Sequence, residues 1–430
     1  MRKKKLIASL MLTSSMMLGA CAGGGDNATT TADTATTTAE QTTQEVTEEV
    51  TTEEVTEAPT TEEETESLSA EEAMIARSHL AIGNNYRVKS VMEKAQAGED
   101  VTIAYLGGSI TEGYNAGTTE IYAKITSDYF RDNYATTGAV NYVNAGLSGT
   151  PSSLGIIRSD RDIFAYDPDI LFIEFAVNDG GTPYDKNAFD SLIMKQLERG
   201  EDKAVIILFS ITSEGYTKQD DYAAIGDYYQ CPMISVRDAI WPEIEAGNMT
   251  WADWSNDEAH PNENGQALYA TFIDTYYDIV SAAEKDEAAE LPSEVCCGVD
   301  LTDMVMYDKN NLAVSSLGSF VEKNGLASFP EGWFKADTET DNAPFTFEID
   351  CKALFIVYKD TSSAKFGFAE VYVDGEKYGK YNGHSSSGWG NPVPKSVFVN
   401  DESAHHVVEI KMEEGQEDLR FNILCFGIIE

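Results

Sequence analysis

Apolar runs alternate with helical stretches between residues 101 and 284, and this alternation constrains the fold more than any other feature. Short runs rich in Val, Ile, Leu and Phe are typical of strands buried on both faces of a parallel sheet. The sequence therefore predicts an α/β fold with a flavodoxin-like, doubly wound parallel sheet. The predicted strands are residues 101–106, 140–144, 169–175, 204–210 and 233–236. The predicted helices are a stretch after Ser152-Ser153 and residues 187–199, 220–229 and 264–284, with an outer N-terminal helix over 70–97.

Polar residues follow the ends of three of these strands. Ser109 lies in Gly-Gly-Ser-Ile-Thr after the first strand, and Gly149 lies in Asn-Ala-Gly-Leu-Ser-Gly-Thr after the second. Asn178 lies in Phe-Ala-Val-Asn-Asp after the third. Because ligands bind at the carboxyl ends of parallel strands, we expect these residues to share one site.

A fourth block, Asp257-Glu-Ala-His260-Pro, precedes the last predicted helix. A serine hydroxyl becomes a nucleophile when a histidine takes its proton and an acid orients that histidine. The predicted catalytic residues are Ser109 as nucleophile, His260 as base and Asp257 as orienting acid. The predicted oxyanion hole consists of the Ser109 N–H, the Gly149 N–H and the Asn178 side-chain amide, because ester hydrolysis requires donors fixed in place beforehand.

Ser, Gly, Asn and His in this order, each in its own block, resemble the SGNH (GDSL-type) hydrolases over roughly residues 98 to 285. Two positions depart from the usual motifs. Gly108 stands where the family has Asp in Gly-Asp-Ser, and Ala176 stands where it has Gly in Gly-x-Asn-Asp. Neither change removes a reacting group. The first block is most similar to the carbohydrate-esterase branch of the family.

The first 68 residues differ in kind from the rest. Residues 1–20 have four basic residues, a short apolar stretch and small residues before Cys21, which resembles a bacterial lipoprotein signal. An ordinary secretory signal with a chance cysteine is the alternative. The resemblance implies lipidation at Cys21 and a membrane anchor on the extracellular face of the cell. Residues 21–68 are rich in Thr and Glu and have too few apolar residues to fold, so we expect a disordered tether.

The chain is strongly acidic. Its formal charge is −43. The basic N-terminus contributes +4 and the tether −13, so residues 69–430 carry −34. Nucleic-acid binding depends on basic patches, so we expect no nucleic-acid partner. No Cys or His grouping has the spacing of a zinc site, and we expect neither a metal nor an organic cofactor. Cys351 and Cys425 lie in strand-like runs and either pair or are simply buried.

Helical periodicity ends near residue 286, after a catalytic domain predicted over 69–286. Residues 299–430 contain short alternating runs and an Asp374-Gly375 turn, and they predict a β-sandwich of jelly-roll type. All four motif blocks precede residue 261, so no essential catalytic group is expected from the sandwich. We expect a structural role for it, unless Trp333 or Trp389 lies exposed on a flat face.

Trp251 and Trp254 lie just before Asp257. They either form a wall against which sugar rings stack or cover the edge of the core. With the family resemblance, these features predict a tethered serine esterase that removes acyl groups, chiefly acetyl, from a polysaccharide or oligosaccharide. The alternatives are a lipase, lysophospholipase or thioesterase of the same family, and a glycan-binding surface protein without activity.

Overall fold

The computed structural model describes residues 68–116, 120–323, 325–339 and 341–430. The predictions for the signal, for Cys21 and for nearly all of the tether lie outside the described residues. Residues 66–430 form one compact unit. None of its described helices is long and apolar enough to cross a membrane.

The first part of this unit is the predicted α/β domain. A six-stranded sheet has the order β1-β6-β5-β4-β2-β3, in which β2 to β6 are parallel. The order of those five strands is the flavodoxin-like order, which confirms the predicted fold class. The strands are β1 (His79–Ala81), β2 (Val101–Gly107), β3 (Val140–Gly146), β4 (Ile170–Glu174), β5 (Ala204–Phe209) and β6 (Met233–Ser235).

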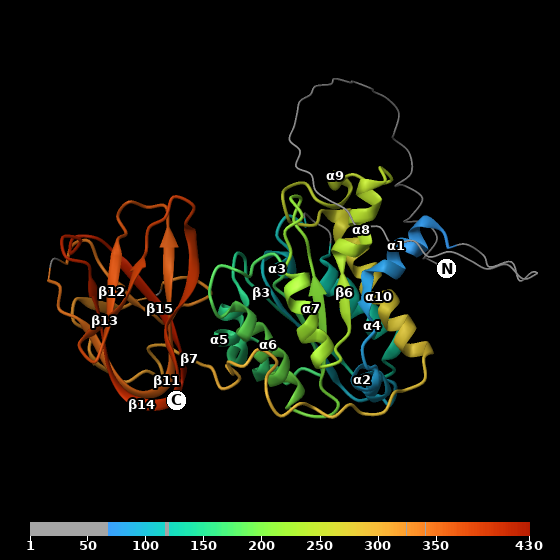
Figure 1. Ribbon diagram of the computed structural model, residues 1–430, viewed down its shortest axis with the longest axis horizontal. Helices are drawn as coiled ribbons and strands as arrows, with labels where there is room; N and C mark the ends of the chain where they lie inside the picture. The colour runs from blue at the N-terminus through green and yellow to red at the C-terminus, as the bar shows by residue number, and fades with distance from the viewer. Residues whose placement is uncertain (1–67, 117–119, 324, 340) are drawn as a thin grey trace, which may run out of the picture. The chain divides into compact units, whose positions relative to one another are not determined.

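Helices cover both faces of the sheet (Figure 1). Alternate residues of β2 belong to different cores: Ala104 and Leu106 face α5 to α7, whereas Ile103 and Tyr105 face α2, α4 and α10. This period of two is what a strand buried on both faces requires. The helices are α1 (Ala70–Ser78), α2 (Tyr86–Gln96), α3 (Ser109–Glu112), α4 (Tyr122–Tyr134), α5 (Ser152–Asp162), η2 (Phe164–Tyr166), α6 (Asp185–Leu197), α7 (Gln219–Tyr228), α8 (Val236–Glu245), α9 (Trp251–Trp254) and α10 (Glu263–Ala282).

One predicted element is wrong. The single helix expected over 70–97 is two helices, α1 and α2, separated by β1. The short β1 pairs antiparallel with β6 and adds an edge strand to the sheet. Gly83 follows β1 with a φ of +66°, and a Cβ there would lie 2.5 Å from the backbone N of Pro232. This close approach and left-handed turn suit glycine and interrupt the helix.

The second part is an antiparallel β-sandwich, as predicted. Its main strand order is β13-β12-β14-β11-β15-β10-β9, with β7 on β15 and β8 on β11. The two longest strands, β11 and β14, pair with three register shifts, which let them bend around the core. The strands are β7 (Val305–Tyr307), β8 (Val314–Ser316), β9 (Phe320–Glu322), β10 (Trp333–Lys335), β11 (Phe345–Thr361), β12 (Phe368–Val373), β13 (Glu376–Asn382), β14 (Trp389–Met412) and β15 (Phe421–Ile429).

The sandwich shares a hydrophobic core with the α/β domain. Phe355, Leu424 and Ile429 of the sandwich belong to the same buried cluster as Leu154 and Phe189 of α5 and α6. Such a continuous apolar contact favours a fixed arrangement of the two domains, since separating them would expose this surface to water.

Candidate active site

Ser109, His260 and Asp257 form a continuous hydrogen-bonded relay. His260 Nε2 lies 2.8 Å from Ser109 Oγ, and His260 Nδ1 lies 2.9 Å from Asp257 Oδ2. Because Asp257 fixes the proton on Nδ1, Nε2 is left to accept the serine proton. The structure thus brings together the three residues that the sequence assigned to nucleophile, base and orienting acid.

The end of β2 places Ser109. The strand ends at Gly107, and Ser109 begins the short helix α3, where its side chain is 8 % exposed. A Cβ on Gly108 would lie 2.2 Å from Asn178 Oδ1. The glycine that replaces the usual Asp of the motif therefore leaves room for Asn178 directly beside the nucleophile turn.

Asp257 is held as a carboxylate. Its Oδ1 accepts hydrogen bonds from the backbone N–H groups of His260, at 2.8 Å, and Ala259, at 2.9 Å. Partial burial raises the pKa of Asp257, but these N–H groups and the His260 ring outweigh it and lower the pKa to about 2. Asp257 is therefore ionised at neutral pH.

Local hydrogen bonds fix the loop that carries Asp257 and His260. Ser255 Oγ donates to His260 O at 2.6 Å, and Trp251 Nε1 donates to Asp257 O at 2.6 Å. Just beyond the loop, Asn262 caps α10 by accepting a hydrogen bond from the N–H of Gly265. His260 thus lies between a hydrogen-bonded loop and the start of the long helix α10.

Gly149 and Asn178 lie at the same edge of the sheet as Ser109. Gly107 is in register with Gly146 of β3 and Glu174 of β4, so the loops after these three strands start side by side. Glu112 of α3 accepts a hydrogen bond from the N–H of Ser148 at 2.8 Å and ties the Gly149 loop to the nucleophile helix. Both predicted oxyanion residues are therefore next to the nucleophile turn.

Asp179 anchors the Asn178 loop. It accepts hydrogen bonds from Ser152 N at 2.8 Å, Ser152 Oγ at 2.6 Å and the Tyr222 hydroxyl at 2.9 Å. Burial and the neighbouring Asp185 raise the pKa of Asp179 to about 7. Asp179 thus fixes the loop that carries Asn178, and Asn178 itself lies against Gly108.

Trp389 of the sandwich lies against Gly149. The φ of Gly149 is +67°, and a Cβ there would lie 3.0 Å from Trp389 Cζ2. The Trp389 side chain is nevertheless 63 % exposed. The sandwich therefore presents an exposed indole against Gly149, whereas its other predicted candidate, Trp333, is buried.

Two residues of the site were not predicted from the sequence. Tyr114, which is 54 % exposed, makes an edge contact with the His260 ring at a centroid distance of 4.7 Å. Asn115 Nδ2 donates to Asp257 Oδ2 at 2.5 Å. Both follow α3, and Asn115 has a φ of +62° that directs the chain back toward the relay. The only signal in the sequence is their proximity to Ser109.

Three other tryptophans, Trp251, Trp254 and Trp333, are more buried than Trp389. Trp254 is 1 % exposed and packs in the core, so its predicted place in a substrate wall is corrected. Trp251 is half-buried and binds the Asp257 carbonyl, which leaves it a mainly structural part. Trp333 is fully buried in the sandwich core, as its structural assignment expected.

Among the described residues, no group of His, Cys, Asp and Glu is arranged to hold a metal ion. Cys351 and Cys425 are buried free thiols rather than a disulfide. The histidines outside the relay hydrogen-bond to backbone or to sandwich acids; His79, for example, contacts Phe272 O at 3.0 Å.

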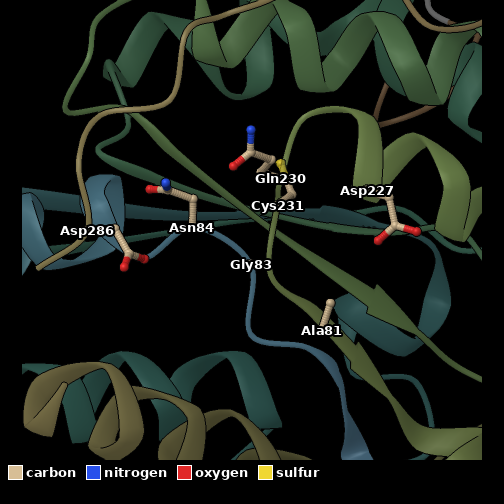
Figure 2. Close-up of a pocket in the computed structure, with 7 residues that line it drawn as sticks. All are labelled: Ala81, Gly83, Asn84, Asp227, Gln230, Cys231 and Asp286. Atoms are coloured by element: carbon tan, nitrogen blue, oxygen red, sulfur yellow. The ribbon is translucent and has the colours of Figure 1, made fainter. Parts of the chain in front are cut away.

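An open polar hollow lies at the amino ends of the strands, beside the start of β6. Figure 2 shows its lining, which comes from the end of β1 and the segment after it, the end of α7 and the turn after it, and the chain beyond α10. The lining residues are Ala81, Gly83, Asn84, Asp227, Gln230, Cys231 and Asp286. Because the relay lies at the carboxyl ends of the strands, this hollow is separate from it.

The chain resembles a protein family in sequence and several solved structures in fold. Residues 105–268 match the GDSL-like lipase/acylhydrolase family. A two-domain esterase described as active on acetylated mannans is similar in structure, with a TM-score of 0.74, 24 % identity, and coverage of 83 % of this chain and 98 % of its own. Its structure co-crystallized with mannopentaose gives a TM-score of 0.73 at the same identity and coverage. The acetylxylan esterase Axe2 from Geobacillus stearothermophilus covers 42 % of this chain and 96 % of its own at 18 % identity, with a TM-score of 0.34. No curated protein sequence matches.

Proposed function

We propose that this chain, whose residues 105–268 match the GDSL-like lipase/acylhydrolase family, is a serine esterase that removes acetyl groups from acetylated mannan. The observation that supports this most is the Ser109–His260–Asp257 relay, together with the exposed Trp389 indole against Gly149. The relay supplies the chemistry of ester hydrolysis, and the indole supplies a surface for a sugar ring.

In the proposed mechanism, His260 Nε2 takes the proton from Ser109 Oγ as the oxygen attacks the acetyl carbonyl carbon. The carbon–oxygen bond to the sugar breaks, and His260 gives its proton to the departing hydroxyl. Water then attacks the acetyl-serine, again with His260 as base, and releases acetate. Asp257 remains ionised throughout and stabilises the imidazolium.

The tetrahedral oxyanion is proposed to bind between the N–H groups of Ser109 and Gly149 and the Asn178 amide. One such donor is worth about 3–4 kcal/mol in the transition state of a comparable hydrolase. The tight packing of Gly108 against Asn178 supports this assignment, since it holds the amide beside the nucleophile turn.

Three observations support the proposed substrate class. The relative that covers 83 % of this chain is described as active on acetylated mannans. Neutral polysaccharides also suit a chain with a formal charge of −43, whose field would repel strongly anionic polymers. Sugar C–H groups stack on aromatic faces, and two aromatic residues are exposed here: Tyr114 against the His260 ring and Trp389 against Gly149.

The test is acetate release from acetylated mannan and acetylated xylan, together with p-nitrophenyl esters of increasing chain length. Acetylated mannan is expected to be the better polymer substrate, and hydrolysis rates are expected to fall for acyl chains longer than acetyl. The Ser109→Ala variant is the control for non-enzymatic hydrolysis. Preference for long acyl esters would instead make the protein a lipase or thioesterase.

We further propose that the protein is exported and anchored through lipid on Cys21, with residues 22–68 as a spacer. The basis is the sequence Leu-Gly-Ala before Cys21 and the acidic, Thr-rich segment that follows. Metabolic labelling with a tagged fatty acid is expected to mark wild type but not Cys21→Ser. Equal labelling of both proteins would refute the anchor.

A further inference from the structure

Glu174 is a buried carboxyl group beside the nucleophile turn that the proposed mechanism does not use. It is the last residue of β4, is 0 % exposed and is in register with Gly107 of β2. A Cβ on Gly107 would lie 2.6 Å from the Glu174 carbonyl oxygen. Burying an ionisable group costs free energy. We therefore expect the carboxyl group of Glu174 to have a role beside the turn that carries Ser109.

On one side, Glu174 contacts the helix of the nucleophile. Thr111 Oγ1 donates to Glu174 Oε2 at 3.4 Å and lies 2.9 Å from the Tyr122 hydroxyl. Thr111 is fully buried in α3, two residues after Ser109. A shift of the Glu174 carboxyl would therefore displace Thr111, which lies two residues after Ser109 in the same helix.

On the other side, Glu174 is linked to the helix that follows the base. Ser210 Oγ lies 3.0 Å from the Tyr269 hydroxyl of α10, and the Ser210 hydroxyl lowers the pKa of the Glu174 carboxyl. The same helix holds α4 through Gln266 Oε1, which accepts the Tyr122 N–H at 2.8 Å. Tyr269 and Tyr122 also stack at a centroid distance of 4.5 Å, so the network closes on itself.

We propose that Glu174 is a positioning residue whose carboxyl group couples the nucleophile turn to α10, the helix that follows His260, and so holds Ser109 Oγ and His260 Nε2 at hydrogen-bonding distance. This inference rests on the proposed roles of Ser109 and His260. In this role Glu174 acts through Thr111 and Ser210 and not on the substrate or the reacting atoms.

The protonation state of Glu174 gives the proposal a distinct signature. Burial raises the pKa of Glu174 to about 7, against the hydroxyls of Ser210 and Thr111, which lower it. The ionisable groups that face it are the phenols of Tyr122 and Tyr269, whose pKa values burial raises well above their usual range. As the pH rises through about 7, Glu174 gains a buried charge that favours a rearranged network. Turnover is therefore expected to decline there.

The experiment compares wild type with Glu174→Gln, which is neutral and nearly isosteric, and Glu174→Leu, which removes the polar contacts. Asp190→Asn is the matched control, since Asp190 is also a fully buried carboxyl but bonds to Tyr229 and Cys297 at 2.6 Å. The measurements are kcat and KM for p-nitrophenyl acetate from about pH 5.5 to 9, on protein shown to be folded by circular dichroism. The rate of Ser109 labelling by a fluorophosphonate probe reports nucleophile activation without an acyl substrate.

The expected result is a fall of about 10- to 100-fold in kcat and in labelling rate for Glu174→Leu, with KM within about twofold. Glu174→Gln is expected to stay within about fivefold of wild type at pH 6 and to lack the decline near pH 7. Asp190→Asn is expected to keep the wild-type pH profile.

Wild-type kcat in folded Glu174→Leu would overturn the proposal, because Glu174 would then be only structural. If Glu174→Leu does not fold, the pH profile of Glu174→Gln decides, and a profile that superimposes on wild type overturns it. Persistent activity of Ser109→Ala is a different failure: it would refute the proposed function through its nucleophile, whatever the Glu174 variants show.

Discussion

The indole of Trp389 packs over Gly149, with Cζ2 at 3.0 Å from the position that a Cβ on Gly149 would occupy. Gly149 belongs to the loop after β3, and Trp389 begins β14 of the sandwich. One contact therefore joins the predicted oxyanion hole to the second domain. It suggests that the sandwich helps to hold a polymer at the relay rather than only stabilising the chain.

Substitution of the relay residues tests their roles directly. Ser109→Ala is expected to lower kcat by about 10³-fold or more, because the nucleophile is lost. His260→Ala is expected to cost more than Asp257→Asn, because Asp257 orients the proton carrier but does not itself transfer the proton. The measurement is kcat on p-nitrophenyl acetate at equal folded concentration. A larger loss for Asp257→Asn than for His260→Ala would reassign the two roles.

Gly149→Ala is expected to lower kcat by about 10- to 100-fold. An alanine at a φ of +67° costs about 1–2 kcal/mol, and its Cβ would press on the Trp389 ring, so the Gly149 N–H is expected to move away from the oxyanion. Gly247→Ala is the matched control, because Gly247 has a φ of +74° and nothing within 4 Å of the new Cβ. It should lower Tm with kcat unchanged. Equal kcat losses in both variants would show a general effect of destabilisation.

Trp389→Ala is expected to raise KM for acetylated mannan by about tenfold, because a stacking surface worth about 1 kcal/mol or more is removed. Its kcat/KM for p-nitrophenyl acetate should change by less than about threefold, since a small ester does not span the two domains. Tyr378→Ala is the control, because Tyr378 is 47 % exposed on β13 of the same sandwich. An equal loss on mannan in that variant would place polymer binding on the sandwich surface at large.

The contribution of Asp257 to stability is expected to disappear in acid. Folding lowers its pKa to about 2, below the usual value near 4, so the stabilisation is present above pH 4 and is lost as the pH falls toward 2. The difference in unfolding free energy between wild type and Asp257→Asn should be constant above pH 5 and shrink between pH 4 and 2. Urea denaturation at each pH measures it. A difference that shrinks above pH 5 would mean that another group is responsible.

Much of the catalytic domain follows from the sequence alone. Buried parallel strands need nearly continuous apolar residues, and five such runs separated by helical segments allow few arrangements other than the one observed. The sheet then brings the residues after its strands to one edge, so the positions of Ser109, Gly149 and Asn178 after three predicted strands are enough to group them. Asp257 and His260 are three residues apart, so their contact is local as well.

Only the tertiary structure shows the features that depend on contacts between residues far apart in the chain. Trp251 and Trp254 look alike in the sequence, yet α9 turns Trp254 into the core and leaves Trp251 bound to the Asp257 loop. The helix predicted over 70–97 is interrupted because β6 offers an edge for β1 to pair with.

Trp333 and Trp389 likewise lie in similar strand contexts, but one is fully buried and the other meets Gly149 from a separate domain. Residue periodicity records which side of an element is apolar. It contains no information about which surface that side will meet, because packing between segments far apart in the chain is fixed only when the whole core forms.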